Sequence, residues 1–260
     1  MSPHRIRIDR EESKVKDEDV IKTVEEVFDS FTNYHVYRLR NSMKAFKELK
    51  GAVSAGKEAR VYWAKGWRGE DLAVKIYLTS SAEFRKSIKN YIAGDPRFPS
   101  VPSKFRDLVY LWARKEYGNL EDMAKAGVSV PTPVAVSGNV LVMRFLGENG
   151  LRAPLLVEAW RELEDEDVER MFNLLVDDIE RMVCKARLVH GDLSEYNIMI
   201  WEGRPWIIDV AQAVSLDHPK SRELLERDLS NVFSFFSHRL DVSEKEESLR
   251  RSLEQCLEAS

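Results

Sequence analysis

The chain has 260 residues, of which 43% are hydrophobic, 32% are charged and 10% are aromatic, and its formal net charge is −4. This apolar content is enough for the core of one large or two small domains, and it excludes an intrinsically disordered chain. The near balance of 44 acidic and 40 basic residues excludes a wholly basic surface for nucleic acid and allows only a local basic patch.

The sequence contains no signal for a membrane or for an oxidising compartment. Its apolar runs are far shorter than the roughly 20 residues that a membrane span needs, and residues 1–10 are polar and basic, unlike a signal peptide. The two cysteines, Cys184 and Cys256, offer neither a disulfide framework nor the spacing of a zinc site. We therefore expect a globular, cytoplasmic protein that has no membrane partner.

The beginning of the chain predicts a helical segment followed by a small sheet. Residues 11–48 carry apolar residues at helical spacing between charges, which predicts an N-terminal helical extension over 1–47. Two β-prone runs, 59–64 and 72–77, are separated by glycines and predict antiparallel strands.

The next part of the chain predicts an insertion, a helix and a further strand. Residues 79–103 contain Gly94 and three prolines and show no sustained period, so we expect a flexible, mostly irregular insertion. A helix should follow from about residue 104 and end at Gly127, and a strand is expected over 140–146.

The remaining sequence predicts a mainly helical half. Residues 165–187 place apolar side chains on one stripe, with acidic residues in the first turns where a helix dipole favours them. Short strands are expected over 197–201 and 206–210, and helices over 218–239 and 242–259.

These elements predict an α+β fold of two lobes. A small antiparallel-sheet lobe over 48–146 would contain the insertion and a hinge, and a mainly helical, truncated lobe would follow over 147–260. We expect a cleft between the two lobes.

Three side chains with oxygen atoms suited to bind a cation stand beside the short strands predicted in the second lobe. Asp192 and Asn197 stand five residues apart just before a strand, and Asp209 closes the next β run. An aspartate, an asparagine and a second aspartate on a hairpin suit Mg²⁺ (or Mn²⁺) that is held together with substrate phosphates. The pattern therefore predicts phosphate chemistry.

Two features of the first lobe could contact phosphates. Lys75 ends an apolar strand, and the loop 51–58 offers backbone amides, a hydroxyl group and an ammonium group. The loop nearly matches a Walker A motif up to Lys57, but Glu58 stands where that motif needs serine or threonine. The residues after Glu58 also favour a strand over the helix of a P-loop, so we reject the Walker A interpretation.

Together these features resemble the RIO family of atypical protein kinases. The resemblance covers residues 48 to 238 and is closer to the type-one subfamily, because the preceding segment is too short for the winged-helix domain of the type-two subfamily. It implies a protein-kinase-like fold, ATP as substrate and a role in late maturation of the small ribosomal subunit. The motifs that carry it are SAGKEA (Ser54–Ala59), WARKEYGNL (Trp112–Leu120), HGDLSEYN (His190–Asn197) and IDVAQA (Ile208–Ala213).

The resemblance assigns the catalytic and metal-binding roles residue by residue. Asp192 matches the catalytic aspartate, which positions or deprotonates the attacking hydroxyl group. Asn197 and Asp209 match the metal ligands. The family also forms an aspartyl phosphate at the residue that matches Asp209, so ATP hydrolysis is an expected activity.

Further matches concern ATP itself. Lys75 matches the lysine on the α- and β-phosphates, and Glu116 matches the helix glutamate that pairs with it. The hinge, residues 143–146, would bond adenine through the backbone at Arg144 and Leu146, and the ring would lie between two apolar side chains, Ala73 and Met199. The complete set of expected ATP-binding residues is Ser54, Ala55, Gly56, Lys57, Lys75, Glu116, Met143, Arg144, Leu146, Tyr196 and Asn197.

The sequence departs from ordinary protein kinases near its catalytic residues. Gly191 stands where they have arginine, so we do not expect control by a phosphorylated activation loop. Ser194 stands where they have lysine, and we assign the missing charge to Lys57. The triplet that begins at Asp209 lacks phenylalanine and glycine, and no Ala-Pro-Glu signal follows it, so neither a flipping switch nor the usual peptide-docking helices are expected. His190 is expected to be a structural histidine bonded to backbone.

Three functions remain open at this stage. The protein could be a kinase that phosphorylates itself or a partner's serines, or an ATPase switch that controls docking on a precursor of the small ribosomal subunit. A small-molecule kinase of the aminoglycoside or choline type has similar motifs, but the loop Ser54–Ala59 argues against it. A monomer is favoured.

The insertion is the expected contact to ribosomal RNA and ribosomal proteins. Residues 79–107 carry six basic and three acidic side chains, a local net charge of +3. Such a patch could meet RNA phosphates. Ser100 and Ser103 stand among prolines, and we expect self-phosphorylation there.

Overall fold

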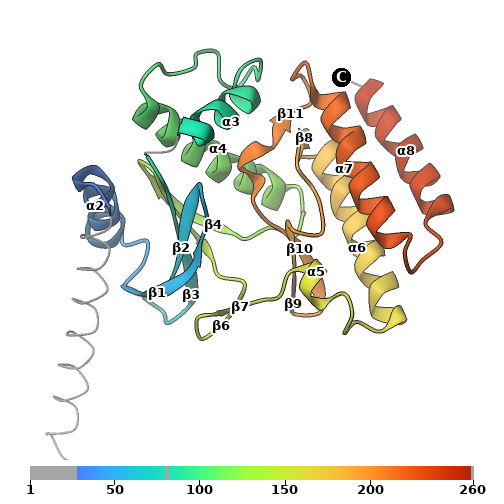
Figure 1. The fold of residues 1–260 in the computed structure, drawn as a ribbon, viewed down its shortest axis with the longest axis horizontal. Coiled ribbons are helices and arrows are strands. Elements are labelled where there is room, and N and C mark those ends of the chain that lie inside the picture. The colour runs from blue at the N-terminus through green and yellow to red at the C-terminus, as the bar shows by residue number, and fades with distance from the viewer. Residues whose placement is uncertain (1–27, 80–81, 259–260) are drawn as a thin grey trace, which may run out of the picture.

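A five-stranded antiparallel sheet forms the first lobe of the computed structural model, which describes residues 28–79 and 82–258 (Figure 1). The strand order is β1–β2–β3–β5–β4. The strands are β1 (Glu48–Ala55), β2 (Ala59–Lys65), β3 (Asp71–Tyr77), β4 (Pro133–Ser137) and β5 (Val140–Arg144). The expected strands β2, β3 and β5 are confirmed. The sequence patterns missed β1 and β4, since β1 contains a glycine and two register shifts and β4 begins with proline.

Strand β3 separates a structural face from a functional face. Because side chains alternate along a strand, every second residue packs on the helical segment that precedes β1. These residues are Leu72, Val74 and Ile76. The residues between and after them face the cavity described below, namely Ala73, Lys75 and Tyr77.

The segment before β1 is a short helix that ends in a π-helical turn. Helix α2 (Ser30–Tyr37) begins where the Asp29 carboxylate accepts hydrogen bonds from the N–H groups of Phe31 and Thr32, at 3.0 and 2.8 Å. The turn η1 (Arg38–Ser42) follows it directly. The helix expected over 11–48 therefore ends too late in our prediction. Its first part, 11–27, lies outside the described residues.

The insertion contains a helix, which corrects the expectation of a mostly irregular segment. Helix α3 (Ala82–Ile92) buries Phe84, Ile88 and Ile92, which recur every four residues. The glycine and the prolines that suggested irregular structure all follow this helix in the sequence. Among the described residues that follow this helix in the insertion, 93–103 contain neither helix nor strand.

Helix α4 (Phe105–Lys125) crosses from the sheet toward the second lobe (Figure 1). It follows Lys104 and is succeeded by Gly127, whose φ of +84° favours glycine, as the sequence predicted. Trp112, Leu120 and Met123 are buried along it. The helix thus contributes apolar side chains to the cores of both lobes.

The second lobe is built around three long helices. They are α6 (Asp165–Cys184), α7 (Ser221–Phe236) and α8 (Ser243–Glu258), and α5 (Leu156–Ala159) is short. All three were expected from the sequence. Small two-stranded sheets pair β6 (Gly147–Glu148) with β7 (Leu151–Arg152), β8 (Leu188–Val189) with β11 (Val214–Ser215), and β9 (Ile198–Trp201) with β10 (Arg204–Ile207).

The architecture is α+β, with a small antiparallel-sheet lobe and a mainly helical lobe, as the sequence predicted (Figure 1). One large apolar core joins α6, α7 and α8, and a second core lies beneath the sheet. Among the described residues, no helix has the length and apolar character needed to cross a bilayer.

A disulfide corrects the prediction for the two cysteines. Cys184 and Cys256 are bonded to each other, with Cα atoms 5.3 Å apart. The bond joins the last residue of α6 to the last turn of α8. The sequence could not show this pairing, because 72 residues separate the cysteines and only the packing of α8 on α6 brings them together.

Candidate active site

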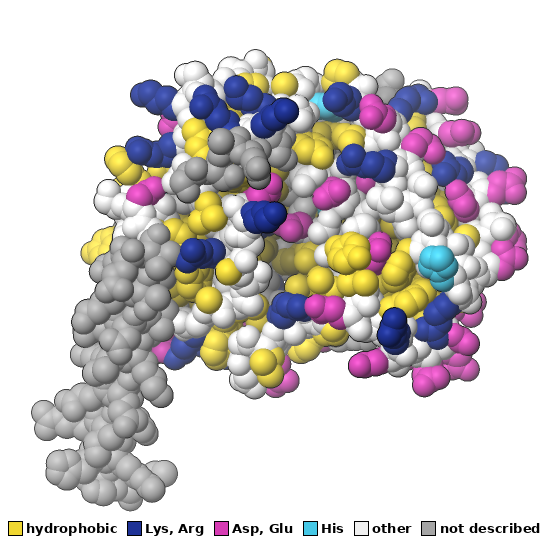
Figure 2. Space-filling model, viewed as in Figure 1, with side chains coloured by type: hydrophobic (Ala, Val, Ile, Leu, Met, Phe, Trp, Pro, Cys, Tyr) yellow, Lys and Arg dark blue, Asp and Glu magenta, His cyan; other side chains and the backbone are white. Residues whose placement is uncertain are grey.

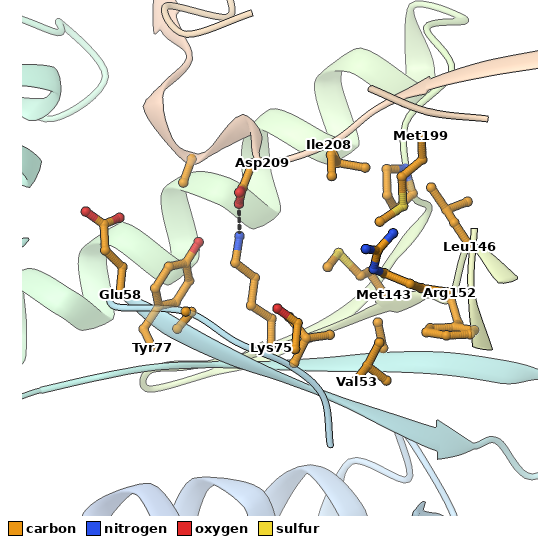
Figure 3. A pocket seen from close by; sticks show the side chains of 18 of the residues that line it. Val53, Glu58, Lys75, Tyr77, Met143, Leu146, Arg152, Met199, Ile208 and Asp209 are labelled. Carbon is orange, nitrogen blue, oxygen red and sulfur yellow. Dashed lines mark hydrogen bonds and ion pairs between the residues drawn. The ribbon is translucent and has the colours of Figure 1, made fainter. Parts of the chain in front are cut away.

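A cavity of about 470 Å³ lies between the sheet and the segments that follow the hinge. The sheet supplies its floor, and the residues around β9 and β10 supply its roof (Figure 3). Of the expected site residues, those that line it are Ser54, Gly56, Lys57, Lys75, Met143, Arg144, Leu146, Tyr196 and Asp209. The remaining four, Ala55, Glu116, Asp192 and Asn197, are not part of this lining.

Lys75 joins two acidic side chains at one end of the cavity. Its ammonium group donates to Glu116 Oε1 at 2.8 Å and also contacts Asp209 Oδ1 (Figure 3). Burial alone would lower the pKa of Lys75, but Asp209 and Glu116 raise it well above its usual value. The lysine is therefore held as a cation, which is the form that attracts phosphate.

Tyr77 completes this cluster, and sequence reasoning missed it. Its hydroxyl group donates to Glu116 Oε2, and burial together with the Glu116 charge raises the pKa of Tyr77 well above its usual value. Glu116 comes from α4 and is 1% exposed. Both of its oxygens thus have a donor, which fixes the glutamate and orients Lys75. The position of Tyr77 two residues after Lys75 on β3 is the signal that places both on one face.

Asp209 leaves the strand β10 through an unusual backbone conformation. Its φ is +60°, a left-handed region that aspartate tolerates better than most residues. This corrects the strand expected over 206–210, which ends at Ile207. The side chain of Asp209 is 58% exposed and points into the cavity (Figure 3). The Lys75 ammonium lowers the pKa of Asp209, against the opposing effect of desolvation.

The donor set fits a magnesium ion that is held mainly by substrate. Asn197 donates from Nδ2 to the Asp192 carbonyl at 2.7 Å, which leaves its Oδ1 oxygen as the end suited to a cation. The Asp209 carboxylate has one oxygen beyond the one that meets Lys75. The described residues contain no group of three or more His, Cys, Asp or Glu side chains that could hold a metal alone. Mg²⁺ with phosphates needs only one or two protein carboxylates.

His190 has a structural role, as the sequence predicted. It is fully buried, and its Nε2 nitrogen lies 3.0 Å from the carbonyl of Ile208. Its Nδ1 nitrogen accepts the N–H of Asp192 at 3.3 Å. The two contacts assign the proton to Nε2. The histidine therefore ties the loop that carries Asp192 to the strand end that carries Asp209.

Asp228 supports the same loop from α7, and sequence reasoning missed it. Its two carboxylate oxygens accept the N–H groups of Gly191 at 2.7 Å and Leu193 at 2.8 Å. Burial raises the pKa of Asp228, while these bonds oppose the shift. Arg227 adds a contact to the Gly191 carbonyl. Both neighbours of Asp192 are thus fixed, and its own side chain stays exposed. No local sequence pattern pointed to Asp228, because its place in the helical period of α7 does not reveal a bond to the distant loop around Asp192.

The loop that was expected to cover phosphates is shorter than the sequence suggested. Residues 51–55 belong to β1, and only Gly56, Lys57 and Glu58 form the turn. The N–H of Gly56 donates to the Ala59 carbonyl at 2.9 Å, and a Cβ atom at Gly56 would come within 3.2 Å of that oxygen. Lys57 is exposed and lines the cavity.

Glu58 is an acidic lining residue without an assigned role. Burial and the Asp209 charge raise the pKa of Glu58, while Lys75 opposes the shift. Its side chain faces the same end of the cavity as Tyr77 and Lys75 (Figure 3). The motif contained this residue, but the comparison with Walker A treated it only as a mismatch.

The hinge end of the cavity is lined by apolar side chains, with Arg152 beside them (Figure 3). Met143 from β5 and Met199 from β9 line it together with Leu146 and Ile208 (Figure 3). The Arg144 N–H is already bonded to the Thr132 carbonyl at 2.8 Å. Within the described part of the chain the Leu146 N–H has no partner, so it is the free backbone donor of the hinge. Ala73 and Met199, between which the sequence placed the adenine ring, both line the cavity.

Comparisons with known proteins agree with this geometry. Residues 60–249 match the model of a RIO domain. The chain is 43% identical over 230 residues to the serine/threonine-protein kinase RIO1 of Caenorhabditis elegans, covering 88% of this chain and 44% of that protein. It is 41% identical to the RIO-type serine/threonine-protein kinase Rio1 of Haloferax volcanii, covering 86% of this chain and 74% of that protein.

A solved structure supports the fold. The chain is similar to the Rio2 kinase–ADP/Mg²⁺–phosphoaspartate complex from Chaetomium thermophilum, with a TM-score of 0.63, 22% identity, and coverage of 88% of this chain and 70% of that one. The chain spans less than half the length of the nematode relative and about three quarters of the Haloferax relative. The family match extends over most of the chain, and the kinase-like fold agrees with it. The chain belongs to the RIO family of serine/threonine protein kinases, in its type-one branch.

Proposed function

We propose that the protein binds ATP in the cavity and transfers the γ-phosphoryl group to a serine or threonine hydroxyl group, or to water. The main support is the ion-pair chain from Glu116 through Lys75 to Asp209, which places a cation and a carboxylate at one end of the cavity. The relatives are named serine/threonine-protein kinases, which favours the same reaction class. Residues 48–146 and 147–260 would act as its two lobes.

Each binding residue then has a defined task. Asn197 and Asp209 would hold Mg²⁺ (or Mn²⁺), which supplies charge compensation for the phosphates when bound. Lys75 would contact the α- and β-phosphates. Lys57 would cover the γ-phosphate from the turn before β2, since Ser194 supplies no cation.

Transfer to a hydroxyl group needs a proton acceptor, and Asp192 is our candidate. The substrate oxygen would attack the γ-phosphorus, its proton would pass to the Asp192 carboxylate, and the bond from the γ-phosphorus to the bridging oxygen would break and release ADP. The exposed side chain of Asp192 on a fixed backbone suits this role.

Transfer to water could proceed through Asp209. The Rio2 structure from Chaetomium thermophilum is a complex with phosphoaspartate. By analogy, an Asp209 oxygen would attack the γ-phosphorus with release of ADP, and water would then hydrolyse the acyl phosphate to free phosphate and the original carboxylate.

Comparing phosphate release with phosphate transfer tests the proposal. Purified protein with Mg²⁺ and γ-labelled ATP should release phosphate and should label protein, and mass spectrometry should find label at Ser100 or Ser103. Asp192→Ala should abolish label on serine while ADP binding persists. If wild-type protein neither binds ATP nor consumes it, the proposal is wrong.

A second candidate function is an ATP-dependent switch in late maturation of the small ribosomal subunit. Basic side chains over α3 and the start of α4 favour it, because they gather on one edge of the molecule (Figure 2). The exposed ones are Arg85, Lys86, Lys89, Lys104 and Arg106. Arg97 does not belong to this patch, because it pairs with the buried Asp95 at 2.7 Å.

This switch would act in the cytoplasm, as a monomer, on a precursor that contains rRNA and ribosomal proteins. Its test is whether purified small-subunit precursors alter phosphate release. A rise in turnover without labelling of ribosomal proteins would favour the switch over the protein kinase, and labelling of a ribosomal protein would favour the kinase.

A further inference from the structure

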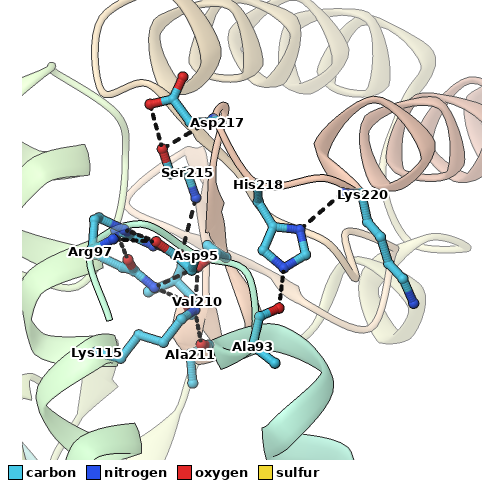
Figure 4. A network of polar contacts seen from close by, with 12 residues as sticks. Ala93, Asp95, Arg97, Lys115, Val210, Ala211, Ser215, Asp217, His218 and Lys220 are labelled. Atoms are coloured by element: carbon cyan, nitrogen blue, oxygen red, sulfur yellow. Dashed lines mark hydrogen bonds and ion pairs between the residues drawn. The ribbon is translucent and has the colours of Figure 1, made fainter. Parts of the chain in front are cut away.

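A buried polar network surrounds the loop that follows Asp209 (Figure 4). The loop consists of the short helix η2 (Val210–Gln212) and Ala213. Two side chains of α4, Lys115 and Asn119, approach it from one side. Both are essentially buried, at 1% and 0% exposure. Burying the amino group of Lys115 is costly unless its donors are satisfied, so these contacts must offset that cost.

The donors of these two residues all go to backbone carbonyls of the loop. Lys115 Nζ donates to Ala211 O at 2.8 Å and also to Ala213 O. Asn119 Nδ2 donates to Val210 O at 2.7 Å and to Ala213 O at 3.2 Å. The carbonyls of three of the four loop residues, Val210, Ala211 and Ala213, are therefore bonded to one helix, and side-chain identity in the loop contributes nothing to these bonds.

The segment after α3 also contributes to the network (Figure 4). Arg97 donates to Asn119 Oδ1 at 2.8 Å and to Ala213 O at 3.2 Å. Asp95 holds Arg97 through two bonds of 2.9 and 2.7 Å and also accepts the N–H of Ser215 at 3.4 Å. Ala213 O thus collects donors from Lys115, Asn119 and Arg97.

Helix α4 therefore reaches Asp209 by two separate routes. Glu116 holds Lys75, which contacts the Asp209 carboxylate, while the adjacent Lys115 holds the backbone two residues after Asp209. Asn119 lies one helical turn beyond Lys115 on the same face. The left-handed backbone of Asp209 joins these two restraints, so a shift of the loop would displace the carboxylate from Lys75.

We propose that Lys115 and Asn119 are positioning residues for Asp209 and that the Asp95–Arg97 ion pair holds them in place. They act through the backbone of 210–213 and keep the carboxylate oriented toward the cavity in the absence of any phosphorylated activation loop. The expected consequence, stronger Mg²⁺-dependent nucleotide binding, rests on the proposed function. The structural part, that Lys115 and Asn119 hold the loop, rests on the loop contacts alone.

The test uses full-length Lys115→Met, which preserves the length of the side chain and suits a buried site, and Asn119→Leu. Lys125→Met is the matched control, because Lys125 lies exposed in the last turn of the same helix. Hydrogen exchange of the peptide over 207–216 and ADP affinity with and without Mg²⁺ are measured, together with the unfolding temperature.

We expect both variants to exchange faster over 207–216. The factor by which Mg²⁺ increases their ADP affinity should fall about tenfold, whereas their ADP affinity without metal should change less than about twofold. Unchanged exchange and unchanged Mg²⁺ dependence in a folded variant would overturn the proposal. So would an equal loss of metal-free and Mg²⁺-dependent affinity, which indicates a general structural role.

Arg97→Met keeps the test decisive if the first variants fail to fold, since Arg97 is only partly buried. Arg97→Met should show the same changes to a smaller extent. If it shows no change, the role of the Asp95–Arg97 pair is contradicted. If the wild-type protein shows no gain in ADP affinity with Mg²⁺, the proposed function fails. The exchange measurement then still decides whether Lys115 and Asn119 hold the loop.

Discussion

The ammonium group of Lys75 lies between Glu116 and Asp209, although Asp209 is 134 residues away in the sequence. The two acids come from different lobes, so this contact is where the sheet and the helical lobe meet at the cavity. Glu116 is nearly inaccessible, whereas Asp209 is open to the cavity. The same cation therefore has one buried partner and one partner that faces the cavity.

Removing Lys75 should destabilise the protein through Glu116. Lys75→Met leaves a buried carboxylate without its counter-charge, which costs about 3 kcal/mol of unfolding free energy. The double variant Lys75→Met/Glu116→Leu should recover most of this loss, although it remains inactive. Urea unfolding checks both, and equal stability of the single and double variants would show that Glu116 does not need the lysine.

Lys57→Ala should lower ATP turnover by about ten- to a thousandfold, since Lys57 is the proposed charged donor to the γ-phosphate. ADP binding should weaken much less, because ADP lacks that phosphate. Lys47→Ala is the control, as Lys47 is exposed and outside the cavity lining. Equal turnover of wild type and Lys57→Ala at saturating ATP would mean that Lys57 is only a solvated hairpin lysine.

Reduction of the Cys184–Cys256 bond should lower stability without affecting the site directly. The bond closes a loop with a sequence separation of 72 residues, so opening it should remove about 4 kcal/mol of unfolding free energy in the chain-entropy account. Guanidinium unfolding with and without a thiol-free reductant measures the loss. Cys184→Ser/Cys256→Ser should match the reduced wild type and should not respond to reductant, and a reductant-insensitive wild type would contradict the bond.

Glu158 should give the protein a small acid-sensitive stabilisation. Bidentate bonds from Arg152, at 2.7 and 2.6 Å, and the N–H of Leu155 lower the pKa of Glu158 from 4.5 to about 2. Because the folded pKa is the lower one, the stabilisation is complete above about pH 4.5 and disappears as the pH falls toward 2.

Glu158→Gln should therefore cost less than about 1 kcal/mol at neutral pH, since the ion pair is exposed and screened. Unfolding measured from pH 7 to pH 3 should show the difference from wild type shrinking with acid. A difference that grows in acid would refute the assignment.

The sequence singled out side chains that the structure brings together, but it did not reveal the residues that support them. Lys75, Glu116 and Asp209 stand in motifs whose residue types reveal their chemistry, and the structure brings these three together. Asp228 and Tyr77 were missed, because their partners are backbone groups or side chains that only the fold brings close.

The same reason explains the errors in the fold. The period of α3 was hidden beside a proline-rich stretch, and the cysteine pair depends on helix packing that no local pattern records. The long helices α4, α6, α7 and α8 were predicted because amphipathic periods of four or more turns are unambiguous.

Asp209 is proposed both to bind the metal and to accept phosphate. The most direct test of this proposal is Asp209→Asn, which preserves size but removes the charge, assayed with γ-labelled ATP and Mg²⁺ for turnover and for an acyl phosphate that hydroxylamine cleaves. We expect both the turnover and the acyl phosphate to be lost, while the protein remains folded and binds ADP without metal. Normal turnover in Asp209→Asn would contradict it.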